Sequence, residues 1–139
     1  MNSQFLKSGV SLAAFTMLAL VGCGGRVEHE TFMVKGKVTY EGEPLNEGIV
    51  TFEDTTNGHT GEGEIAADGF YRVRVMKGSY KVRVTPPTVE VDEGPDSPPS
   101  VGMKEMKNIP EKYRGYQSGF IVDVNGDMES GADLAMTAE

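Results

Sequence analysis

Few side chains in this sequence could act as nucleophiles, general bases or metal ligands. Cys23 is the only cysteine, so no disulfide can form within the chain. The two histidines, His29 and His59, lie in polar segments, where solvent-exposed imidazoles are the simplest interpretation. No G-x-S-x-G, H-E-x-x-H or phosphate-binding glycine motif is present, although the 21 acidic residues would permit a carboxylate pair. The sequence therefore predicts a protein that is not an enzyme and has no cofactor.

The acidic residues offer the other candidate chemistry. Residues 86–108 are rich in Pro and acidic residues and have no periodic apolar pattern, which predicts a long exposed loop, part of it flexible. Hard cations prefer carboxylate oxygens, so a calcium or small-ligand site is one interpretation of this segment, and solvated loop carboxylates are the other. The weak candidate ligands are Glu90, Asp92, Glu93 and Asp96.

The amino-terminal segment has the features of a secretory signal peptide. Lys7 provides one positive charge, and the apolar run from Val10 to Val21 is too short for a transmembrane span. We therefore expect three parts: a signal peptide at 1–22, a polar tether at 23–31 and one folded domain at 32–139.

The residues around the lone thiol indicate what that thiol does. Leu20, Val21, Gly22 and Cys23 match the lipobox of bacterial lipoproteins. This resemblance implies that Cys23 receives a diacylglyceryl group, that the chain is cleaved before Cys23 and that the new amino terminus is acylated. Several acyl chains, at ~0.8 kcal/mol per buried methylene, anchor a protein more firmly than one. The alternative is an ordinary signal peptide with an incidental cysteine.

Charge and sorting features predict the location and the partners. Loss of Lys7 with the signal peptide changes the net charge from −8 to −9, and an acidic surface repels nucleic acid. Gly24 follows Cys23 where an aspartate would stand in inner-membrane lipoproteins, so the chain resembles outer-membrane cargo if the cell has two membranes. The expected partners are the membrane, through lipid on Cys23, and an envelope protein or glycan.

A meander of short β-strands is expected from Val34 to Val84. β-Branched and aromatic residues alternate there with polar ones, and Gly, Pro, Asn and Asp separate the runs. Gly36, inside the first run, indicates a bulge or a close backbone approach. The expected strands are 32–40, 49–53, 61–66, 70–75, 79–85, 118–124 and 131–137, with a helical turn within 109–116. The expected hairpin turns are Asn57-Gly58, Asp68-Gly69 and Asn125-Gly126.

Basic side chains alternate with the apolar ones in two of these strands. Arg72 and Arg74 lie in one strand, and Lys81 and Arg83 lie in the next. We expect them to form one solvated sheet surface, with a basic stripe for an anionic ligand as the alternative.

The order of turns and strands resembles a known domain, the carboxypeptidase regulatory-like (transthyretin-like) domain. The residues that carry the resemblance are Val34, Gly36, Val38, Thr39, Tyr40, Gly42, Pro44, Leu45, Gly48, Val50, Phe52, Asp68, Gly69, Tyr71, Val73, Gly78, Tyr80, Val82 and Val84. The resemblance implies an all-β fold, a seven-stranded Greek-key β-sandwich. It implies no catalysis, because in carboxypeptidases this domain carries no active site. The lipobox together with this domain resembles short bacterial lipoproteins of unassigned function.

These observations lead to two functional hypotheses. The first is a non-catalytic, membrane-anchored envelope lipoprotein that displays a β-sandwich as an interaction or structural module. The alternative is a carrier for calcium or a small ligand that uses the acidic loop at 90–96.

Overall fold

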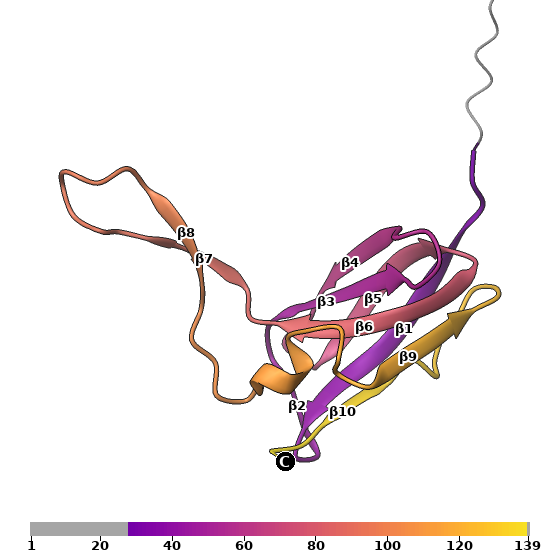
Figure 1. The fold of residues 1–139 in the computed structure, drawn as a ribbon. Helices are drawn as coiled ribbons and strands as arrows, with labels where there is room; N and C mark the ends of the chain where they lie inside the picture. The colour runs from indigo at the N-terminus through magenta and orange to yellow at the C-terminus, as the bar shows by residue number, and fades with distance from the viewer. Residues whose placement is uncertain (1–27, 139) are drawn as a thin grey trace, which may run out of the picture.

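The structure, a computed structural model, describes residues 28–138 and consists mostly of β-strands (Figure 1). Its elements are β1 (Thr31–Tyr40), β2 (Glu43–Pro44), β3 (Ile49–Asp54), β4 (Thr60–Glu64), β5 (Phe70–Met76), β6 (Gly78–Thr85), β7 (Thr88–Val91), β8 (Ser100–Met103), the 3-10 helix η1 (Glu111–Tyr113), β9 (Phe120–Val124) and β10 (Leu134–Met136). Within the described residues, no helix has the length and apolar character needed to cross a membrane.

Eight of these strands form two sheets that pack against each other. In the first sheet, β1 pairs antiparallel with β5 along most of its length, and its last residues pair with β2 and, in parallel, with β10. The second sheet has the order β4-β3-β6-β9, and all its pairs are antiparallel. The all-β prediction is confirmed. The described residues contain the short strands β2, β7 and β8 in addition to the expected strands, so the count of seven stays a prediction. The Greek-key order also stays a prediction.

The core lies between the two sheets and follows the period-two pattern of the strands. Alternate residues of each long strand point inward, so apolar and polar side chains separate onto two faces. The Phe52 ring lies at the centre, with its centroid 6.2 Å from that of Tyr71 and 5.8 Å from that of Tyr80. The valines that surround these rings are Val34, Val38, Val50, Val73, Val75, Val82, Val84 and Val124.

Glycines in two strands allow backbone segments to approach closely. A Cβ at Gly36 would lie 2.2 Å from the carbonyl oxygen of Ala132, which confirms the predicted close approach. A Cβ at Gly63 would lie 2.2 Å from the carbonyl oxygen of Arg72. Gly63 belongs to β4 and Arg72 to β5, so Gly63 brings together strands of the two different sheets, whereas Gly36 brings β1 against the segment that precedes β10.

The 3-10 helix closes one end of the core. Ile109 is fully buried, and the Tyr113 ring stacks on Phe120 with a centroid distance of 5.2 Å. Arg114 donates hydrogen bonds of 2.8 Å to the carbonyl oxygens of Ile109 and Met106, which hold the segment in place. The expected helical turn is therefore confirmed in a shorter form, and Pro110 lies immediately before its first residue.

The prediction of one solvated basic surface is wrong. β5 pairs with β1, whereas β6 pairs with β3 and β9, so Arg72 and Arg74 lie on one sheet and Lys81 and Arg83 lie on the other. The turn between β5 and β6 carries the chain across the sandwich instead of folding it into a hairpin. Side chains alternate in the same way whether two consecutive strands form a hairpin or lie in different sheets, so the sequence pattern could not distinguish these two arrangements.

Of the three expected hairpin turns, only Asn57-Gly58 joins paired strands, β3 and β4, because Asp68-Gly69 turns the chain from β4 to β5 in the other sheet. Gly58 and Gly69 have the positive φ angles, +72° and +86°, that such turns require. The hairpin at Asn125-Gly126 is wrong, because β9 and β10 lie in different sheets. After β9 the chain instead crosses to β1, where Met33 donates its N–H to the Asp127 carboxylate at 2.8 Å.

Candidate functional site

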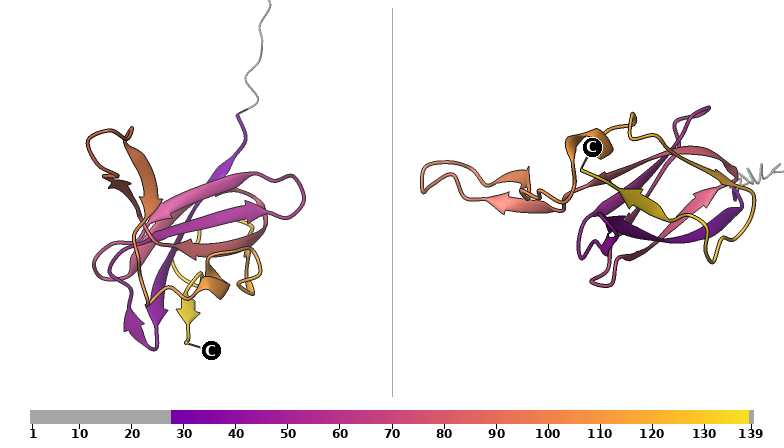
Figure 2. Two further views of the ribbon diagram at one scale, coloured as in Figure 1. Left: turned by 60° about the vertical axis from the view of Figure 1, so that its left-hand side comes forward. Right: turned by 90° about the horizontal axis from the view of Figure 1, so that it is seen from below.

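Cys23, the predicted lipidation site, lies outside the described residues. The first described residues, from Glu28 to Glu30, are exposed and lead into β1. Figure 1 and the right-hand view of Figure 2 place this beginning of β1 at one end of the molecule.

The segment 86–108 extends from the other end of the molecule as a β-hairpin (Figures 1 and 2). It is exposed as predicted, but β7 and β8 pair within it, with Thr88 opposite Met103 and Val91 opposite Ser100. The Lys104 N–H donates to the Pro87 carbonyl and closes the base of the hairpin, and the Lys104 side chain forms an ion pair of 2.5 Å with Glu47 of the sandwich. The hairpin is therefore a defined projection of the fold.

The hairpin carries apolar side chains that no other part of the described chain covers. Val101 is 72% exposed and Met103 is 62% exposed, and both lie on one face of the hairpin. Val89 and Val91 lie on the opposite face and are also exposed. A lone two-stranded hairpin is marginally stable in water, and a sheet or a partner that covers its apolar side chains stabilises it. Exposed apolar residues of this kind indicate a contact surface.

The predicted acidic residues lie at the outer end of this hairpin. Glu90, Asp92 and Glu93 line one shallow pocket of about 340 Å³, whereas Asp96 does not line it. Asp92 accepts a hydrogen bond of 3.0 Å from the Gly94 N–H, and Glu93 accepts one of 3.1 Å from the Ser100 hydroxyl. Among the described residues, no group of three or more His, Cys, Asp or Glu side chains is placed to hold a metal ion. The carboxylates therefore support the turn and give the hairpin a negative charge.

The outer face of β1 and β5 carries the opposite charge, and we call it the β1–β5 face. It consists of the outward side chains of Lys35, Lys37, Phe70, Arg72 and Arg74. Lys35 lies opposite Arg72, and Lys37 lies opposite Phe70 with its Nζ 5.3 Å from the centre of the ring. Phe70 is 52% exposed.

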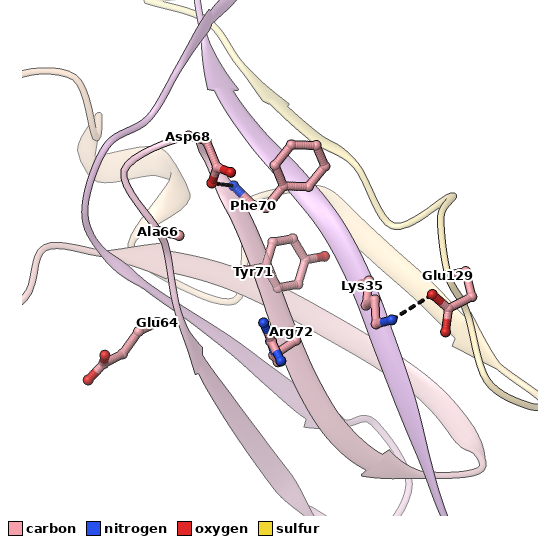
Figure 3. Close-up of a pocket in the computed structure, with 8 residues that line it drawn as sticks. All are labelled: Lys35, Glu64, Ala66, Asp68, Phe70, Tyr71, Arg72 and Glu129. Carbon is pink, nitrogen blue, oxygen red and sulfur yellow. Dashed lines mark hydrogen bonds and ion pairs between the residues drawn. The ribbon is translucent and has the colours of Figure 1, made fainter.

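A pocket of about 400 Å³ opens on the β1–β5 face beside Phe70 and Arg72 (Figure 3). Lys35 forms an ion pair of 2.5 Å with Glu129 at its rim. Two of its other lining residues are acidic, Glu64 and Asp68. Within the described part of the chain, neither Arg72 nor Arg74 has a carboxylate within ion-pair distance. The pocket is therefore mixed in sign, and Arg72 and Arg74 carry positive charge of this face that is unpaired within the described residues.

The two histidines, which are 30 positions apart in the sequence, line one shallow pocket of about 320 Å³. Glu30, Asn57 and Lys77 also line it. Sequence reasoning treated His29 and His59 separately, and no local pattern could have brought them together. Their exposure agrees with the prediction, and in the described residues no hydrogen bond joins either imidazole to a hydroxyl group.

Tyr71 is the titratable group most strongly affected by the fold. Burial raises the pKa of its hydroxyl far above the usual value, and the nearby Asp133 carboxylate raises the pKa further. The hydroxyl therefore remains protonated and donates a hydrogen bond of 2.5 Å to the carbonyl oxygen of Ala132. This is a structural role, since it fixes the segment before β10 against β1 and β5.

Comparisons with known proteins give one match. A protein-family model described as "Protein of unknown function (DUF1416)" matches residues 16–106, which include the strands from β1 to β8. No curated protein and no solved structure matches the chain.

Proposed function

We propose, for a chain that belongs to the DUF1416 family of proteins of unknown function, a role as a non-catalytic interaction module of the cell envelope. In this proposal, lipid on Cys23 anchors the chain to a membrane, and the β7–β8 hairpin binds a partner away from that membrane.

The single observation that carries the proposal is the projecting hairpin with exposed apolar side chains on both faces. Covering Val101 and Met103 with another surface is favourable by ~25 cal/mol per Å² of apolar area removed from water. An extended hairpin also offers backbone N–H and C=O groups along its edges, which suits recognition of a protein partner.

The anchor is proposed from the sequence of residues 20–23, which match a lipobox. The arrangement of the described residues is compatible with it, because the beginning of β1 and the hairpin lie at opposite ends (Figure 1). A lipid before β1 would then hold the hairpin away from the bilayer. The outer membrane is the proposed location in a cell with two membranes.

The resemblance to the carboxypeptidase regulatory-like domain supports a structural scaffold without catalysis. Gly36 and the Asp68-Gly69 turn, which belong to that pattern, have roles in backbone packing and turn geometry. We include the Greek-key β-sandwich of that domain in the proposal.

Two measurements test the anchor and the hairpin separately. In a bacterial host, the full-length chain should incorporate labelled palmitate and sediment with membranes, and Cys23→Ala should abolish both. A photoreactive amino acid at Val101 should give a discrete crosslinked species in intact cells, whereas one at Ile121 should not. Ile121 is a matched control because it is 64% exposed and lies on β9. Equal yields at the two positions would refute the hairpin as the binding surface.

The alternative function is a carrier for calcium or a small ligand at the acidic end of the hairpin. The pocket lined by Glu90, Asp92 and Glu93 is the observation that favours it. Calorimetric titration of the full-length chain with calcium tests this alternative. Heat that disappears in the variant with Asp92→Asn and Glu93→Gln would support it, and no heat would exclude calcium.

A further inference from the structure

We infer that the hairpin of one copy binds the β1–β5 face of a second copy of this chain. This inference rests on the proposed function of the hairpin and names its partner.

The first argument is charge. The hairpin carries Glu90, Asp92 and Asp96, and in the described residues none of them has a basic group within ion-pair distance. The β1–β5 face carries Arg72 and Arg74, which also lack such a pair in the described part of the chain. Contact between the two surfaces gives each set of like charges a counter-charge. Complementary charges of this kind set the choice and the orientation of the partner more than the affinity.

The second argument is the arrangement of apolar groups. On one face of the hairpin, Val101 lies opposite Glu90, so an apolar row runs beside an acidic residue. On the β1–β5 face, Phe70 and Arg72 are neighbours on the same side of β5, so an exposed ring lies beside a cation. The pocket beside Phe70 is lined mostly by charged residues, so the exposed ring itself is the apolar contact that this face offers (Figure 3). Apolar burial supplies the affinity, and a central aromatic anchor is typical of such contacts.

The third argument is geometry. The hairpin projects away from the sandwich in both views of Figure 2, so it reaches a neighbouring molecule more readily than its own β5. Two different surfaces of the same chain then meet, which makes the contact heterologous. A heterologous contact leaves one hairpin and one face free in every dimer, so it extends to rings or open rows of copies.

Cysteine crosslinking in cells tests this inference directly. Two full-length copies with different tags are expressed together, one with Val101→Cys and the other with Phe70→Cys. Mild oxidation should then produce a dimer that carries both tags. Neither variant alone should give more dimer than the unsubstituted chain, which reports any background from Cys23. Ile121→Cys replaces Phe70→Cys as the matched control and should give no dimer with Val101→Cys.

Charge exchange tests the orientation in the same assay. Arg72→Glu in the copy with the cysteine at position 70 should lower the yield of mixed dimer. Glu90→Lys in the other copy should restore it, because the pair has opposite charges again. High salt should lower the yield of the original pair, since exposed charges are screened.

Each other outcome overturns the inference in a distinct way. Dimers formed by Val101→Cys alone would show a symmetric hairpin contact, and equal yields with Ile121→Cys would show random collision. No mixed dimer, together with a photocrosslink from Val101 to another molecule, would refute the second copy and leave the proposed function intact. No crosslink of either kind would refute both.

Discussion

Substitution of Gly36 by alanine should destabilise the protein through one identifiable contact. The added Cβ would lie 2.2 Å from the carbonyl oxygen of Ala132 and 2.9 Å from Cε1 of Tyr71. Ordinary contact begins near 3.4 Å, so the segment before β10 must move by about 1.2 Å. Gly36 has no positive φ, so backbone strain at the residue itself makes no contribution.

The size of the effect follows from three terms. Overpacking of a filled core costs ~1–3 kcal/mol, and loss of the hydrogen bond from Tyr71 to the Ala132 carbonyl adds ~1–2 kcal/mol. Restriction of the unfolded chain by alanine offsets ~0.4–1 kcal/mol. We therefore expect the free energy of unfolding to fall by ~2–4 kcal/mol, which corresponds to a decrease of about 8–16 °C in Tm.

Urea denaturation followed by circular dichroism measures this change. Gly115→Ala is the matched control, because its Cβ would meet no atom within 4 Å, and it should change the free energy of unfolding by less than ~0.5 kcal/mol. In the Gly36→Ala background, Tyr71→Phe should cost less than it does alone, since the carbonyl has already moved. A Gly36→Ala protein as stable as the control, or strictly additive costs, would refute this reasoning.

Three further predictions concern other groups. The pKa of Tyr71 is raised in the folded state, so the free energy of unfolding should fall as the pH rises above about 10, the pKa of tyrosine in the unfolded chain. The fall should reach up to ~1.4 kcal/mol per pH unit. Tyr71→Phe should remove this contribution to the slope of unfolding free energy against pH. Asp54→Ala should lower the free energy of unfolding, measured in urea, by ~1–2 kcal/mol. The reason is that the Asp54 carboxylate accepts hydrogen bonds from the N–H groups of Thr56 (2.7 Å) and Asn57 (3.2 Å). Asp54→Asn keeps an acceptor oxygen and should cost less. Val101→Ser should change the melting temperature by less than about 2 °C, because the side chain contributes nothing to the core, yet it should abolish crosslinking from a photoreactive amino acid placed at Met103.

Local sequence patterns predicted the parts of the fold that local physics determines. The alternation along β1 and the positive φ at Gly58 and Gly69 depend only on neighbouring residues, and these predictions are confirmed. The role of Gly36 was also predictable, because a glycine within a strand has few explanations other than a bulge or a close approach.

The pairing of the strands was less predictable, because it depends on residues far apart in the chain. Alternation in β5 and β6 is the same whether the two strands share a sheet or lie across the sandwich. The glycines of β4 contain a further signal, since Gly61 and Gly63 alternate on the face that approaches β5. A strand with glycine at every inward position can bring its backbone against another strand, and this pattern could have indicated contact between the two sheets.

The hairpin was missed because its strands lack the usual signals. β7 and β8 have four residues each, and eight residues with several prolines separate them, more than in a tight hairpin. Neither strand has a buried face, so the apolar residues do not appear as a core pattern. Val101 and Met103 could have indicated that this segment makes a contact, since apolar residues in an acidic segment are unexpected unless another surface covers them.

The sandwich and the hairpin that we propose to bind a partner differ in how strongly the fold restricts their residues. In the sandwich, Gly36 and Gly63 lie where any side chain would collide with backbone, so substitution there has a cost in stability. In the hairpin, Val101 and Met103 face solvent, so the folded state places no comparable demand on them. Apolar residues at positions where the fold does not require them increase the risk of non-specific association. The contact that we propose would cover them, and the charged residues beside them would restrict which surface can do so.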